Sequence, residues 1–155
     1  MQVDSFHQKF STESFADSNI QYVRIGRISS DIVNFLKEKS PSLASVLSSE
    51  TDIVFWKDRL LHTERHKNDF MSDTAYLNAL ESIPDIIQNP DYLAIHPKDS
   101  SISFIKDFSD HIAVVVRISV TGKLSYRTMY PLMDAQLTNY LEKGRAWKWT
   151  NKLSD

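Results

Sequence analysis

The feature that most constrains the fold is a change in the hydrophobic period of the chain near residue 91. Before this point the sequence is rich in helix-forming residues, whereas after it apolar and polar residues alternate. The alternating part predicts four strands, over residues 92–96, 102–106, 112–120 and 124–130. A last helix is predicted over 132–143, ending at Gly144. The pattern predicts an α+β fold: an N-terminal strand and helices, followed by a four-stranded antiparallel meander and a C-terminal helix, with the helices packed on one face of the sheet.

The first half of the chain carries clear start and stop signals. Residues 20–28 alternate as a half-buried strand, in which Gly26 indicates a bulge or a close backbone approach. Ser30 is a candidate cap for a helix that Ser40 and Pro41 end, and Ser72 is a candidate cap for a later helix. The other elements expected here are a short strand near 53–55, a helix within 57–68 and a turn of helix between Pro84 and Pro90.

The length of 155 residues predicts one folded domain, which we place at residues 20–145 between an N-terminal extension (1–19) and a C-terminal tail (146–155). Cysteine is absent, which excludes thiol nucleophiles, thiolate metal sites and disulfides. Three glycines are too few for a glycine-rich phosphate loop or a dinucleotide fingerprint. No signal sequence or membrane-spanning run is visible, so we expect a cytoplasmic protein without a membrane partner.

Charge is unevenly distributed along the chain, although the net charge is only −2. Residues 51–116 carry six basic and eleven acidic side chains, whereas residues 117–152 carry seven basic and two acidic ones. A basic C-terminal third indicates a local anionic partner. The alternative is a solvated surface whose lysines and arginines serve solubility alone.

Two histidines, His62 and His66, lie four residues apart in the predicted helix and therefore share one of its faces. Such a pair can transfer protons or bind a metal. The spacing resembles the zinc protease signature, but Thr63 stands where that motif has its glutamate. A metal site would need a third ligand, such as His96 or His111. The plainer alternative is a pair of surface histidines.

A second polar group is expected near the ends of the last two strands. It combines two guanidinium groups, which suit a phosphate, with two hydroxyl donors: Arg117, Arg127, Thr128 and Tyr130. With a histidine these side chains would form a phosphodiester site, and the alternative is an ordinary polar strand face. Lys106 either approaches a phosphate or ends its strand in water. Trp147 and Trp149 either stack on bases or dock the tail onto the domain.

The order of the segments resembles the phage-type branch of the barnase, EndoU, colicin and RelE-like (BECR) nucleases. The closest correspondences are the histidine segment DRLLHTERHK, the step IPDIIQNPDYL before the first meander strand, and the strand ending RTMY with a helix after it. The resemblance covers residues 20–145 and depends on order and spacing.

This resemblance implies metal-independent RNA cleavage without a cofactor, in which the ribose 2′-hydroxyl attacks the adjacent phosphate and leaves a 2′,3′-cyclic phosphate. It implies that His62 and His66 act as general acid and base, that Arg117 or Arg127 binds the phosphate, and that Thr128 and Tyr130 donate hydrogen bonds to it. Lys106, Lys123 and Arg145 are the expected RNA-binding residues.

Three hypotheses follow from the sequence. The first is a small phage- or mobile-element-type ribonuclease, with RNA as substrate and an antitoxin or immunity protein as a partner if it is a toxin. The second is a catalytically inactive BECR-like module that engages or inhibits a host protein or RNA. The third is a metal-dependent hydrolase that uses His62 and His66. The sequence leaves the oligomeric state and the acid and base assignment of the two histidines open.

Overall fold

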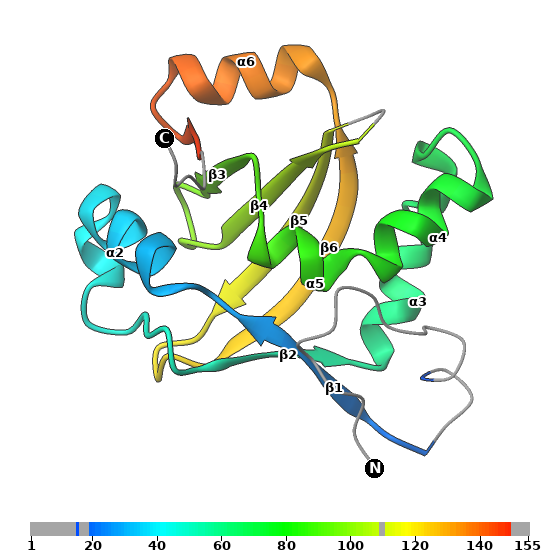
Figure 1. Cartoon of the computed structure of the whole chain (residues 1–155), viewed down its shortest axis with the longest axis horizontal. Helices are drawn as coiled ribbons and strands as arrows, with labels where there is room; N and C mark the ends of the chain where they lie inside the picture. Colours follow the sequence, from blue (N-terminus) through cyan, green and yellow to red (C-terminus); the bar gives the residue numbers. More distant parts are fainter. Residues whose placement is uncertain (1–14, 16–18, 109–110, 150–155) are drawn as a thin grey trace.

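The computed structural model describes residue 15, residues 19–108 and residues 111–149. A single seven-stranded sheet forms the centre of the molecule, in the order β1-β2-β6-β5-β4-β3-β7 (Figure 1). The strands are β1 (Tyr22–Arg27), β2 (Asp52–Trp56), β3 (Tyr92–Ile95), β4 (Ile102–Asp107), β5 (His111–Ile118), β6 (Leu124–Leu132) and β7 (Ala146–Lys148). The helices are α2 (Ser30–Lys39), α3 (Asp58–Glu64), α4 (Asp73–Glu81), α5 (Ile83–Gln88) and α6 (Asp134–Glu142), with short 3₁₀ turns η1 (Pro41–Leu43) and η2 (Lys67–Asp69).

The predicted α+β class is confirmed, and the sheet has seven strands where six strands were predicted, the four of the meander and two before it. Strands β3 to β6 pair antiparallel with their neighbours in chain order. The antiparallel pair β1–β2 joins them through a short parallel contact between β2 and β6. At the other edge β7 pairs with β3, so residues 146–148, expected to belong to a tail, are part of the sheet. Most of the expected extension 1–19 lies outside the described residues.

Both faces of the sheet are covered, because apolar residues occupy both sides of β4 and β5. The larger core contains side chains of α2, α4 and α5 packed on one face, together with Phe104 and Val114 of the sheet. The neighbouring residues Ile105 and Ala113 belong to a smaller core that Leu137 of α6 covers. The expectation that all helices pack on one face is therefore wrong, because α6 covers the other face.

Several local predictions are confirmed. Ser72 caps α4 by accepting a hydrogen bond from the backbone of Ala75. A register shift between Arg24 and Gly26 is the predicted bulge in β1. The helix after β1 starts one residue earlier than predicted, because Ser29 caps it in place of Ser30. None of the helices in the described part of the chain has the length and apolar composition needed to cross a membrane.

Candidate active site

The site is built where α3 lies beside β6. Pairing between β2 and β6 stops at Ser125, and α3, which follows β2, then takes the place of a neighbouring strand. Thr63 of α3 and Tyr126 of β6 are both buried, and their hydroxyl groups form a hydrogen bond of 2.5 Å. Phe55 of β2 stacks on the Tyr126 ring at a centroid distance of 4.1 Å. This contact fixes the helix, and with it the residues next to Thr63, against the strand.

A bulge in β6 supplies the second connection. Val115 pairs with Thr128 and Val116 with Tyr126, so Arg127 is the extra residue that has no partner on β5. Its carbonyl oxygen accepts hydrogen bonds from Nε and Nη2 of Arg59, at 2.9 and 2.5 Å. The guanidinium of Arg59 therefore holds α3 to the bulge, and the Arg127 side chain is left exposed on the surface.

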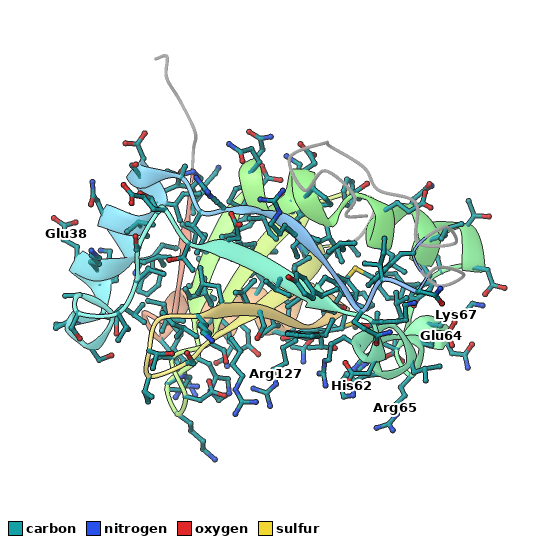
Figure 2. The ribbon with its side chains drawn as sticks, turned by 90° about the horizontal axis from the view of Figure 1, so that it is seen from below. Glu38, His62, Glu64, Arg65, Lys67 and Arg127 are labelled. Carbon is teal, nitrogen blue, oxygen red and sulfur yellow. The ribbon has the colours of Figure 1, made fainter. Side chains whose placement is uncertain are left out.

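His62 lies among cationic side chains on the surface next to this bulge. Burial lowers the pKa of His62, and the nearby charges of Arg59, Arg65, His66 and Arg127 lower it further. In Figure 2, His62 lies between Arg127 and Arg65, and the three side chains point to the same side of the molecule. The imidazole is thus kept neutral close to groups that attract anions.

His66 reaches the same place from outside the helix. A helix within 57–68 is confirmed, but the prediction that it contains His66 is wrong, because α3 ends at Glu64 and the amides of Arg65 and His66 bond to carbonyls three residues back. The ring of His66 is nevertheless 6.2 Å from that of His62 and 6.1 Å from that of Tyr130, measured between centroids. Its Nδ1 lies 3.2 Å from a carboxylate oxygen of Asp69.

The hydroxyl residues of β6 differ in their availability. Burial raises the pKa of Tyr130 to about 12, and Tyr140 adds to the effect, so the phenol keeps its proton at neutral pH. The side-chain oxygen of Thr128 is buried without a hydrogen-bond partner in the described structure. Buried polar atoms are seldom left unpaired, so this oxygen is a candidate contact for a ligand or a water.

Asp99, in the turn between β3 and β4, neutralises part of the positive charge. One of its carboxylate oxygens lies 2.9 Å from Nη1 of Arg127. A hydrogen bond from the backbone of Ser101 lowers the pKa of Asp99 to about 2, with further contributions from the Ser101 side chain, Arg127 and His96. Asp99 therefore carries its charge at neutral pH and competes with any anion for Arg127.

In the described part of the chain, the other predicted site residues make no hydrogen bond or ring contact with either histidine. Arg117 is exposed on β5 and pairs with Ser125, next to the pair of Val116 and Tyr126. Lys106 donates a hydrogen bond of 2.7 Å to the carbonyl of Asn89 and so caps the end of α5. Lys123 is exposed in the β5–β6 turn. Arg145 precedes β7, four strands from β6 and therefore about 19 Å away.

The two histidines considered as a third metal ligand are also separate from the pair. His96 lies in the β3–β4 turn, with Nδ1 3.4 Å from Asp99. His111 lies at the start of β5, hydrogen-bonded through its two ring nitrogens to Asp107 and Asp134. No group of three potential metal ligands was found in the described part of the chain.

Four residues of this site were not identified from the sequence: Arg59, Arg65, Asp69 and Asp99. For the first three a signal existed, since Arg59 and Arg65 lie three residues before and after His62 and Asp69 three residues after His66. Asp99 is 28 residues from Arg127, and only the sheet brings the two together.

The fold and the site thus define an α+β protein with a histidine pair in a cationic surface, a class suited to acid–base chemistry on an anion. A family model described as phage-Barnase-EndoU-ColicinE5/D-RelE like nuclease3 matches residues 30–139. The match covers most of the 155 residues, so the chain belongs to this nuclease family, as the order of its segments predicted. No curated protein and no solved structure matches the chain significantly.

Proposed function

We propose that this protein is a metal-independent endoribonuclease that cleaves RNA by attack of a ribose 2′-hydroxyl on the adjacent phosphate. One observation carries the proposal: two imidazoles 6.2 Å apart lie beside the guanidinium groups of Arg65 and Arg127. Histidine is suited to proton transfer near neutral pH, and arginine is suited to binding a phosphate.

The reaction needs two proton transfers on opposite sides of one phosphorus. A base removes the proton from the 2′-hydroxyl, the resulting oxygen forms a bond to phosphorus, and the bond from phosphorus to the 5′-oxygen breaks. An acid delivers a proton to the departing 5′-oxygen, which leaves as a hydroxyl group. Each nitrogen must come within about 3 Å of its oxygen in the complex with RNA. The rings of His62 and His66, 6.2 Å apart between centroids, are the candidates for the two transfers.

The groups around the histidines favour the charge that develops on the phosphate. Arg127 and Arg65 flank His62, and the protonated Tyr130 phenol beside His66 is a neutral donor. These positive groups are concentrated at one place on a chain whose net charge is −2, which suits local binding of a phosphate more than binding of a whole polyanion.

The test is RNA cleavage in excess chelator, comparing the unmodified protein with the His62→Ala/His66→Ala double variant. We expect fragments ending in 2′,3′-cyclic phosphate from the unmodified protein and none from the double variant. Glu38→Ala is the matched control, because this exposed residue of α2 lies at the far end of the molecule from His62 (Figure 2) and should not affect cleavage.

A second substrate tests whether cleavage depends on the 2′-hydroxyl. An oligonucleotide of the same sequence with 2′-deoxyribose throughout has no internal nucleophile, so the proposed reaction cannot occur on it. Cleavage of this substrate would contradict the proposed mechanism. Intact RNA at high protein concentration, without any inhibitor protein, would refute the nuclease proposal and leave a binding module as the function to test.

A further inference from the structure

We infer that the two histidines have fixed and different roles, in which His62 is the general base, His66 is the general acid, and Asp69 positions His66. The inference rests on the proposed function and extends it, since a histidine pair alone does not say which member begins with the proton. The geometry around the two rings is asymmetric, and this asymmetry assigns the roles.

His66 has a carboxylate partner. The Nδ1 atom of its ring lies 3.2 Å from Oδ2 of Asp69, in the 3₁₀ turn η2 that directly follows. A carboxylate at this distance accepts a hydrogen bond from Nδ1–H and so fixes the orientation of the ring. In the proposed step the other ring nitrogen, Nε2, carries the proton that is donated. Two other rings also lie close to it, those of His62 and Tyr130.

His62 has the opposite surroundings. In the described structure no carboxylate contacts its ring, whereas Arg59, Arg65 and Arg127 approach it from α3, the end of α3 and β6. Three positive charges disfavour a fourth, so the neutral imidazole with its free lone pair is the stable form. Burial and these charges lower the pKa of His62, in agreement with its surroundings. A neutral imidazole can accept the proton of a 2′-hydroxyl at once.

The complete step is balanced between the two rings. Neutral His62 takes the 2′-hydroxyl proton and becomes imidazolium, while the His66 imidazolium gives its Nε2 proton to the 5′-oxygen and becomes neutral. The Asp69 carboxylate keeps its hydrogen bond to Nδ1 throughout and therefore acts as a positioning residue. Hydrolysis of the cyclic phosphate, or proton exchange with water, restores the starting forms.

The experiment compares two dinucleotide substrates that differ in one atom, a bridging 5′-oxygen or a bridging 5′-sulfur. A thiolate leaves without being protonated, so the sulfur substrate needs a base but no acid. We expect His62→Ala and His66→Ala each to lose about 10²- to 10⁴-fold in kcat/KM on the oxygen substrate. On the sulfur substrate His66→Ala should return to within about tenfold of the unmodified protein, while His62→Ala should keep its full loss.

Asp69→Asn tests the positioning role. It should lower kcat/KM on the oxygen substrate by about tenfold or more and have no effect on the sulfur substrate. Asp73→Asn is the matched control, since this exposed carboxylate contacts Lys67 at 3.8 Å.

The outcomes separate the inference from the function on which it rests. Cleavage of the sulfur substrate by a variant also shows that the variant is folded. If the sulfur substrate restores kcat/KM for His62→Ala and not for His66→Ala, the two roles are reversed. If both variants change kcat/KM equally on both substrates, the two histidines do not have separate roles. An unchanged kcat/KM of Asp69→Asn on the oxygen substrate, or an equal loss on the sulfur substrate, would refute its positioning role. If the unmodified protein cleaves neither substrate, the proposed function itself is wrong.

Discussion

The hydrogen bond between Thr63 and Tyr126 should affect both the stability of the protein and its cleavage activity, because it fixes α3 against β6. We consider Tyr126→Phe, Thr63→Val and the combination of the two. Tyr126→Phe keeps the ring that stacks on Phe55 but leaves the Thr63 hydroxyl without a partner at a position with 0% exposure. Thr63→Val likewise leaves the phenol of Tyr126 unpaired.

A buried hydroxyl without a partner costs about 1–3 kcal/mol, so each single variant should lose about this much in free energy of unfolding. The double variant removes both hydroxyl groups and leaves neither unpaired. Its loss should therefore be smaller than the sum of the single losses by about 1–2 kcal/mol. Tyr22→Phe, in the half-exposed first strand, is the control and should change stability by less than about 0.5 kcal/mol.

The measurement is urea unfolding followed by tryptophan fluorescence, combined with the RNA-cleavage assay on folded protein. His62 is the residue before Thr63, so a shift of α3 displaces the proposed base, and we expect kcat/KM to fall about tenfold in Tyr126→Phe. If the losses of the two single variants sum to the loss of the double variant within about 0.5 kcal/mol, the two hydroxyls do not interact. Full cleavage activity in a destabilised single variant would show that this bond does not position the site.

Three further predictions concern other parts of the structure. Gly122→Ala should destabilise the protein by more than Gly144→Ala in thermal unfolding. Both residues have positive φ, but of the two only Gly122 would place the new Cβ 2.6 Å from a backbone oxygen. Equal losses of stability would contradict this. Although burial opposes it, the two carboxylates bonded to His111 raise its pKa, so its contribution to stability should be complete below pH 6.5 and be lost as the pH rises through the folded pKa. His111→Gln should flatten this decrease in urea unfolding series, and an unchanged slope would contradict it. Arg59→Lys keeps the charge but loses the paired hydrogen bonds to the Arg127 carbonyl, so RNA cleavage should fall about fivefold or more, whereas unchanged cleavage would show that the bulge needs no such support.

Where a local signal determines an element, the sequence was sufficient. The cap at Ser72, the bulge at Gly26 and the end of α6 before Gly144 follow from side-chain or backbone chemistry within a few residues. The end of α3 was missed, because nothing in a segment free of glycine and proline signals that the helix stops at Glu64. The role of Lys106 was missed for a related reason, since its partner, the carbonyl of Asn89, is 17 residues away.

The sequence by itself determined the α+β class and the order of the elements from β1 to α6, because period and capping residues are properties of neighbouring positions. It also identified the two histidines, although His66 lies outside the helix in which it was predicted. Only the tertiary structure decided which charged groups surround the pair. The end of β2–β6 pairing brings α3 beside β6, and a bulge then exposes Arg127 next to His62 and Asp99. Contacts of this kind depend on strand register, and a shift of one residue would turn these side chains to the other face of the sheet.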